Sequence, residues 1–537
     1  ALVDIWKGIT FEGTASFQNE EYRRERYSLP VQCYNWFGEQ TAKLVYETTQ
    51  TLSTPQDVLN FKDSHQPGYL VQANNARYQY YSGLLKYKRT FAEVHNIDAM
   101  FGINAEKWVT KKVVTAREKF EDAGIYDLNL ATGTQGNGGG KTHNGTYSYI
   151  ARLNYNYAEK YMVELMGRRD GNSKFASVSL GWAFSEEQFV EFLKPVLSFG
   201  KLRLSYGSSG NDVGLGDYDY VSTVSLGTAG FGTIPANQVS SGFGGLISYD
   251  RTWEKVSQKN FGIDLNFFDN RLKATFDYFI KDNTGMLVNV TYPGVLGGKS
   301  PKTNSGHLNV KGWEFTIGWR DQIKDFSYYA NFNIGDTKSL LKEMEGADSY
   351  GADWNAAVNG YPLNSYFLYR TDGYFKDQAE VDRYYALYGE GKEDLTGVGA
   401  GSASRLRPGD TKRLDLNGDY KISGAGNENS DLQYLGDSNP HFVFGFTLGG
   451  SWKGIDVNAM FQGVGKQYVI RNDWMAYPFQ TRTANQNPTY LGKTWTESNP
   501  NAEFPRLTTN ANLARWNYQN NDFMMQNNRY IRLKTLI

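Results

Sequence analysis

The residues whose types and spacing come closest to a site for chemistry are Asp415, Asn417, Asp419 and Lys421. A D-x-N-x-D spacing converges carboxylate and amide oxygens on a hard cation, and the last residue would add its backbone carbonyl at the seventh position. Tyr420 stands where a glycine permits the sharp turn, and Gly426 stands where a glutamate would close the site. A loop that binds Ca²⁺ or Mg²⁺ is one interpretation. The other is an Asp/Asn-Gly turn held by bonds from side chains to backbone.

Aromatic residues in the longest predicted loop could contact a substrate. The candidates are Trp354, Tyr361 and Tyr366, interleaved with Asn, Asp and Ser. Flat rings beside amides and carboxylates suit the faces and hydroxyls of sugars, and they suit peptides or a protein lid equally well. Large loops also need aromatic packing of their own, so these three residues remain candidates only.

Signals for catalysis are weak in this chain. The five histidines are widely separated and lack the spacing of metal ligands, and neither a G-x-S-x-G elbow nor a P-loop is present. The adjacent Glu186 and Glu187 are explained more simply as first-turn charges of a helix than as glycosidase carboxylates. The sequence therefore predicts a protein that is not an enzyme and requires no cofactor.

Composition narrows the class of protein. The net charge is −1, from 56 basic and 57 acidic residues, which argues against a nucleic-acid partner. No run of about 18 apolar residues is present, so a helical membrane protein is excluded. The single cysteine, Cys33, excludes an internal disulfide framework. Aromatic residues make up 15% of the chain, as suits pleated sheets and the aromatic girdles of membrane barrels.

The stretch 259–281 shows the pattern that organises the chain. Apolar residues alternate with polar ones in 259–267 and again in 271–281, on both sides of a turn at Phe268-Asp269-Asn270. Such alternation predicts a β-hairpin with one apolar and one polar face. Each arm has roughly the 9–11 residues with which a tilted strand crosses a bilayer. The hairpin is therefore predicted to be the repeating unit of a large transmembrane barrel.

About fourteen segments share this strand pattern, and the connections between them alternate between short and long. The long ones are predicted near 121–145, 209–258, 282–309 and 335–441. Helices are expected only at 185–197 and 377–388. Short turns on one side and long loops on the other are typical of outer-membrane barrels. The fold class is thus predicted to be all-β, a large antiparallel barrel; a soluble sandwich or β-solenoid is the alternative.

Blocks of sequence resemble the SusC/RagA-type TonB-dependent outer-membrane transporters. They include Arg168–Phe175 (RRDGNSKF), Lys201–Gly207 (KLRLSYG), Lys259–Asp264 (KNFGID), Lys311–Glu314 (KGWE), Asp415–Asp419 (DLNGD) and Tyr530–Lys534 (YIRLK). The blocks follow the order of the family across most of 147–537, and the first 140 residues match more weakly.

The resemblance implies a 22-stranded barrel closed by an N-terminal plug, with a TonB box near the N-terminus. We expect the plug, the TonB box and the last strands to lie outside this chain. The resemblance also implies a SusD-like surface lipoprotein as a lid, a dimer of transporter–lipoprotein pairs, and energy from TonB with its inner-membrane complex. The expected location is the outer membrane, in contact with lipid, of a Gram-negative bacterium of Bacteroidetes type.

The function implied by this resemblance is active import of oligosaccharides. Import of oligopeptides is the alternative within the same family. A passive porin or adhesin barrel and a surface hydrolase are alternatives from other classes, although no convergent nucleophile and base are visible for the hydrolase.

Overall fold

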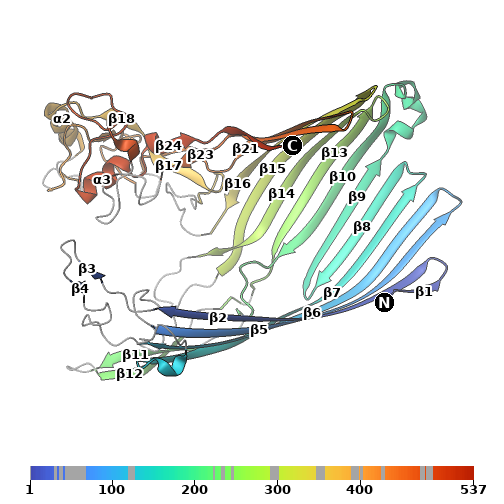
Figure 1. Ribbon diagram of the computed structural model, residues 1–537, viewed down its shortest axis with the longest axis horizontal. Helices are drawn as coiled ribbons and strands as arrows, with labels where there is room; N and C mark the ends of the chain where they lie inside the picture. Colours follow the sequence, from blue (N-terminus) through green and yellow to red (C-terminus); the bar gives the residue numbers. More distant parts are fainter. Residues whose placement is uncertain are drawn as a thin grey trace. The chain divides into compact units, whose positions relative to one another are not determined.

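The computed structural model describes residues 2–28, 33–34, 40–42, 68–118, 127–219, 221, 224–231, 236–243, 247–248, 250–290, 302–345, 357–388, 398–399, 403–424, 430–471, 478 and 488–537. Its main feature is an antiparallel sheet of fifteen strands, in the order β1-β2-β5-β6-β7-β8-β9-β10-β13-β14-β15-β16-β21-β22-β25 (Figure 1). Within the described residues no pairing joins β1 to β25. The predicted all-β antiparallel class is confirmed.

The strands of this sheet are β1 (Leu2–Trp6), β2 (Ile9–Ser28), β5 (Gly68–Phe91), β6 (His95–Glu118), β7 (Gln135–Tyr157), β8 (Tyr161–Asp170), β9 (Ser173–Trp182), β10 (Leu197–Asn211), β13 (Glu254–Phe267), β14 (Leu272–Asn289), β15 (Lys302–Ile323), β16 (Phe326–Glu343), β21 (His441–Trp452), β22 (Ile455–Lys466) and β25 (Tyr530–Leu536). Short two-stranded sheets pair β3 (Cys33–Tyr34) with β4 (Gln40–Ala42), β11 (Val224–Phe231) with β12 (Ala236–Phe243), β17 (Ser365–Tyr369) with β20 (Leu432–Asp437), β18 (Thr371–Tyr374) with β19 (Thr411–Arg413), and β23 (Tyr468–Ile470) with β24 (Met525–Asn527).

The chain divides into two compact units. The first comprises residues 1–158, 163–177 and 215–219, and it contains the long strands β2, β5, β6 and β7. The second comprises residues 159–162, 178–214 and 220–537. In this second unit β10, β13, β14, β15 and β16 lie side by side (Figure 1). The residues discussed below as candidate sites belong to the second unit.

The predicted hairpin is present as β13 and β14. The register runs from Phe267 paired with Leu272 to Lys255 paired with Thr284, without a bulge. Phe268, Asp269 and Asn270 all adopt left-handed backbone conformations, with φ of 54°, 55° and 66°. Asn and Asp tolerate this conformation better than other side chains do, so the turn closes with these residues.

All fourteen predicted strand segments are strands in the structure. The first predicted segment, Trp6–Gln18, corresponds to β2, and the fifteenth strand is β1, which precedes it. A turn joins β1 to β2, and Gly8, at φ 81°, supplies the positive φ there. Several strands also reach into segments predicted as loops: β7 begins at Gln135, β15 begins at Lys302, and β16 ends at Glu343. Backbone pairing with the neighbouring strand continues there although the apolar alternation has ended.

The two predicted helices have different outcomes. Helix α2 (Gln378–Tyr388) is present as predicted. The Asp377 carboxylate caps its start by accepting from the Glu380 amide at 2.8 Å. The helix predicted at 185–197 is wrong in type, because the chain forms two 3-10 helices, Phe184–Glu186 and Gln188–Leu193. Phe189 and Phe192 are exposed there, so too little apolar surface is buried to stabilise an α-helix.

The described residues also form the 3-10 turns Leu128–Leu130, Pro488–Tyr490 and Asp522–Met524 and the helix α3 (Ala511–Tyr518). None of the helices in the described part of the chain has the length and apolar character that crossing a membrane requires.

Candidate functional site

The best-buried part of the second unit is a small mixed body, which we call the α-body. It comprises the described residues of 357–437 and 468–527, with helices α2 and α3 and the short sheets β17–β20, β18–β19 and β23–β24 (Figure 1). Its main apolar cluster contains Phe375, Val381, Tyr384, Tyr385, Val398, Leu406, Ile422, Leu513 and Trp516. Three of these come from α2 at helical spacing and two from α3, so the two helices share one core.

Arg413 lies at the centre of the α-body with its side chain buried. Its guanidinium carbon is 3.9 Å from the ring centre of Tyr369 and 4.2 Å from that of Trp516. The guanidinium donates to the carbonyls of Trp516 and Gln519, at 2.8 and 2.9 Å, and to Oδ1 of Asn521 at 2.9 Å. These carbonyls end α3, where the last helical carbonyls lack partners and the dipole favours a cation. Burial lowers the pKa of Arg413 to about 10, which leaves it charged at neutral pH.

Asp410 is a second buried charged residue of the α-body, three positions before Arg413 in the sequence. The Asp410 carboxylate is fully buried and accepts from the Asn517 amide at 2.7 Å and from Arg506 Nη2 at 3.0 Å. Burial raises the pKa of Asp410, against the opposing effect of the Arg506 charge. Asn517 Oδ1 in turn accepts from the Thr411 amide at 3.0 Å. These bonds join segments about a hundred residues apart, and we interpret them as scaffold because Asp410 and Asn517 find their partners within the α-body.

The loop of the predicted cation site lies on the surface of the α-body, and its side chains point at its own backbone. Asp415 accepts from the amides of Gly418 and Tyr420, at 2.7 and 2.9 Å. Asn417 Oδ1 accepts from the Asp419 amide at 3.0 Å, and Asp419 Oδ1 from the Lys421 amide at 2.8 Å. Tyr420, at the glycine position, adopts φ 63°. This is the geometry of Asx turns, and it favours the interpretation as a hydrogen-bonded turn.

The oxygens of this loop already accept hydrogen bonds from its backbone. Both carboxylate oxygens of Asp415 and the carbonyl oxygen of Asn417 each accept from one amide, and each oxygen has a second lone pair. Within the described residues, no group of three or more His, Cys, Asp or Glu side chains could hold a metal ion. Ca²⁺ or Mg²⁺ at this loop stays a prediction.

Metal removal separates the two interpretations of this loop. With EDTA we expect the wild-type loop to resist limited proteolysis between Asp415 and Gly424 as well as it does with Ca²⁺. The Asp415→Ala variant loses two charge-assisted bonds, and we expect its local stability to fall by about 1–2 kcal/mol in both buffers. Cleavage of the wild type in EDTA at the rate of the variant would instead establish the cation.

Two of the predicted substrate aromatics, Tyr361 and Tyr366, contact other residues of the α-body. Tyr366 is 5% exposed, and its hydroxyl donates to the carbonyl of Tyr468 at 3.4 Å. Tyr361 is 36% exposed, and the centre of its ring lies 5.1 Å from the ring centres of both Phe367 and Tyr434. Both residues therefore pack the α-body. Trp354 lies outside the described residues. As substrate ligands all three remain predictions.

An ion network on the polar face of β10, β13 and β14 has no counterpart in the sequence predictions. Arg203 donates to both oxygens of Asp264, at 2.8 and 3.0 Å, and to both oxygens of Asp277, at 3.1 and 2.9 Å. The register pairs Gly262 with Arg203 on one side and Asp277 on the other. A Cβ on Gly262 would lie 2.6 Å from Arg203 Cζ, so the glycine makes room for the guanidinium.

Comparison with known proteins identifies relatives of the chain. Two TonB-dependent receptors of Formosa agariphila are 24% and 25% identical to it, over 97% and 84% of this chain. The TonB-dependent receptor SusC of Bacteroides thetaiotaomicron is 27% identical over 43% of the chain. The chain spans about half the length of the Formosa relatives, 49% and 44%. No family model matches the chain.

Solved structures agree on the fold. The RagAB peptide transporter superposes with a TM-score of 0.74 at 20% identity, over 100% of this chain and 54% of that one. The RagAB peptide importer in its open-open state gives a TM-score of 0.75 over the same share of this chain. Three observations point to the same class of protein: the strands with one polar and one apolar face, the fold shared with the RagAB structures, and the names of the relatives. They support the resemblance to SusC-type TonB-dependent transporters, and the chain spans about half the length of the Formosa receptors and of the RagAB transporter chain.

Proposed function

We propose that the chain forms the larger part of the barrel of an outer-membrane importer that takes up oligosaccharides with energy from TonB. The observation that carries the proposal is the two-faced sheet. On β13 and β14 the apolar residues Phe261, Ile263 and Phe276 share one face, while Asp264 and Asp277 occupy the other. A barrel with this alternation has a lipid-facing outside and a polar inside.

The polar face supports a sugar as cargo. Beside the ion network, β15 and β16 place exposed, uncharged hydrogen-bonding side chains on this face, namely Thr316, Asn331 and Asn333. An amide offers a donor and an acceptor together, as a sugar hydroxyl requires. A peptide backbone also offers both, and the RagAB neighbours are peptide importers by title. Oligopeptide import is therefore the second candidate.

The partners follow from the same proposal. A SusD-like lipoprotein would cover the outer end of the barrel, and TonB would act through an N-terminal region that precedes the barrel. Two transporter–lipoprotein pairs would form the complete assembly. The relatives carry receptor names, which supports a transporter rather than an enzyme. A passive porin would need neither partner.

Competitive uptake tests the cargo. Cells that produce the full transporter and its lipoprotein receive a mixture of fluorescent oligosaccharides or a mixture of fluorescent oligopeptides of matched mass. We expect accumulation of a sugar, suppressed by excess unlabelled sugar and unchanged by excess peptide. Cells without the transporter gene provide the background. Accumulation of peptide alone would replace the first candidate with the second, and cleavage of sugar at the cell surface without uptake would indicate a hydrolase.

A further inference from the structure

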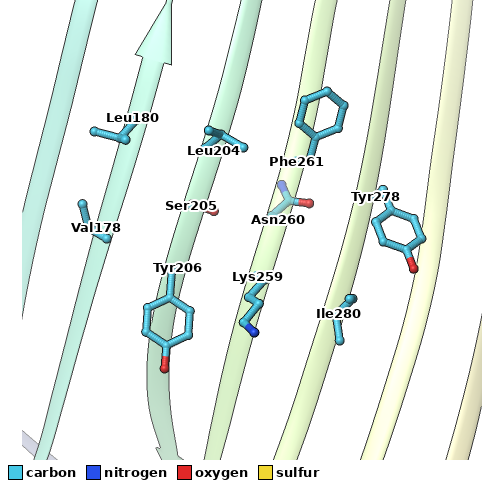
Figure 2. A pocket seen from close by; sticks show the side chains of 10 residues that line it. All are labelled: Val178, Leu180, Leu204, Ser205, Tyr206, Lys259, Asn260, Phe261, Tyr278 and Ile280. Carbon is cyan, nitrogen blue, oxygen red and sulfur yellow. The ribbon is translucent and has the colours of Figure 1, made fainter.

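A shallow groove crosses the apolar face of β9, β10, β13 and β14 (Figure 2). Its volume is about 320 Å³, and its apolar lining is Val178, Leu180, Leu204, Phe261, Tyr278 and Ile280. Tyr206 and Lys259 also border it, next to each other on β10 and β13. A primary amine at the border of an apolar groove is unexpected for a surface that contacts only hydrocarbon, because an unpaired charge in hydrocarbon is costly.

The sheet register aligns two more lysines with Lys259 on the same face. Lys259 pairs with Ile280, Ile280 pairs with Lys311, and Lys311 pairs with Lys338. Because side chains alternate between faces along a strand, residues that pair directly across strands share a face. We call Lys259, Lys311 and Lys338 the lysine row.

The lysine row carries positive charge that the described residues do not neutralise. Lys311 and Lys338 are direct cross-strand partners, an arrangement that destabilises a sheet unless an anion lies between the two charges. All three lysines are exposed, and none has an ion pair within the described part of the chain.

Two acidic residues on the same face belong to other partners. Asp282 accepts from Asn309 at 2.9 Å and lies 3.1 Å from Nε2 of His307, with the Lys342 amine at 3.7 Å. Asp336 lies 2.7 Å from Nδ1 of His441. Neither carboxylate therefore compensates the lysine row.

The position of the row along the strands matches the edge of an apolar band. Lys259 lies eight residues before the tight turn that follows Phe267, and Lys338 lies twelve residues after Phe326. At about 3.3 Å per residue these distances are roughly 26 and 40 Å along the strands. With a strand tilt of about 40°, they correspond to a height of roughly 20–30 Å, close to the band of about 25 Å on membrane barrels.

We propose that the groove and the lysine row form a binding site for a phosphate-bearing membrane lipid. One acyl chain lies in the groove along Leu204 and Phe261. The phosphate is bound by Lys259 at the border of the groove and by Lys311 and Lys338, which continue the row on β15 and β16. Tyr206 adds a hydroxyl at the depth where tyrosine rings favour the membrane interface. Lipid binding at this site would be a property additional to import, and the inference rests on the proposed position of the sheet in the membrane.

Lipid titration of the purified full transporter in detergent tests the site. The probes are dioleoyl phosphatidic acid, dioleoylglycerol with the same chains and no phosphate, and inorganic phosphate, with bound lipid counted by native mass spectrometry. We expect the triple variant Lys259→Gln/Lys311→Gln/Lys338→Gln to bind phosphatidic acid about a hundredfold more weakly, since each surface lysine contributes several-fold to binding an anionic lipid. Dioleoylglycerol binding should not change.

A matched control is Lys273→Gln, an exposed lysine on the opposite face of β14. We expect it to bind phosphatidic acid like the wild type. Equal binding by the triple variant, or an equal loss in the control, would overturn the proposal. Complete competition by inorganic phosphate would do so as well, because it would indicate a free-anion site.

Two further variants keep the test decisive if the triple variant does not fold. The Lys→Arg triple variant retains the charge and should retain phosphatidic acid. Leu204→Trp fills the groove and should weaken phosphatidic acid and dioleoylglycerol together, by about tenfold. A filled groove that leaves both lipids bound would contradict the acyl-chain part of the site. Heat-modifiable migration on gels reports folding for each variant, and none of these measurements uses the transported cargo.

Discussion

Replacing Arg413 with alanine is expected to open the α-body. The variant removes the donors to the buried Trp516 carbonyl, to the partly buried Gln519 carbonyl and to the buried Asn521 side chain. It also leaves a cavity between the rings of Tyr369 and Trp516. Each unsatisfied buried group costs about 1–3 kcal/mol, so we expect a local loss of about 3–5 kcal/mol. Hydrogen exchange of the α3 amides should accelerate by at least about a hundredfold.

Arg405→Ala provides the matched control for Arg413→Ala. Arg405 belongs to the same body and also stacks on a tyrosine, Tyr385, but its ion pair with Asp382 is exposed. Exposed pairs contribute about 0–1 kcal/mol, so α3 exchange should change by no more than a few-fold. Equal exchange rates in the two variants would contradict the assignment of Arg413 as the centre of the α-body. Arg413→Lys should restore only part of the hydrogen-exchange protection of α3, because a single amine cannot make the three hydrogen bonds that the planar guanidinium makes.

Replacing Gly262 with alanine is expected to break the ion network on the polar face. The new methyl group would lie 2.6 Å from Arg203 Cζ and from Asp277 Oδ1, and the guanidinium must move away from at least one carboxylate. The network is about a quarter to a third exposed, so solvent reduces the effect. We expect a loss of about 2 kcal/mol, measured as a lower temperature for conversion to the unfolded gel band.

A double-mutant cycle identifies the cause of this loss. In an Arg203→Ala background, Gly262→Ala should cost much less than in the wild type, because the atoms that it displaces are gone. Gly167→Ala on β8 is the control, since nothing lies within 4 Å of its added Cβ. The same cost in both backgrounds would show that the methyl group acts on the strand itself rather than through Arg203.

The strands were predictable because period-2 alternation depends only on neighbouring residues. The turn at Phe268-Asp269-Asn270 and the register of β13 with β14 follow from it directly. Strand ends were less predictable, as at β7, because backbone hydrogen bonds to an existing neighbour continue after the pattern stops.

The α-body could not be predicted, because its contacts join distant segments. Arg413 meets Asn521 across 108 positions, and Asp410 meets Asn517 across 107. Single polar residues in a loop give no signal of such pairing. The same reason explains why Tyr361 and Tyr366 were predicted as substrate ligands. Their residue type suited a sugar site, but the Tyr361 ring contacts the ring of Tyr434, and the Tyr366 hydroxyl donates to the carbonyl of Tyr468. In the Asp415 loop the spacing was compatible with both a cation site and a turn, and the hydrogen bonds to backbone amides favour the turn.

The central claim is energised import, and uptake with and without TonB tests it most directly. Cells that produce the full transporter and its lipoprotein are given the labelled oligosaccharide, in a wild-type background and in one that lacks TonB. We predict accumulation above the external concentration only when TonB is present, and its loss on collapse of the proton-motive force. Equal entry in both backgrounds, stopping at the external concentration, would contradict the account and indicate a passive pore.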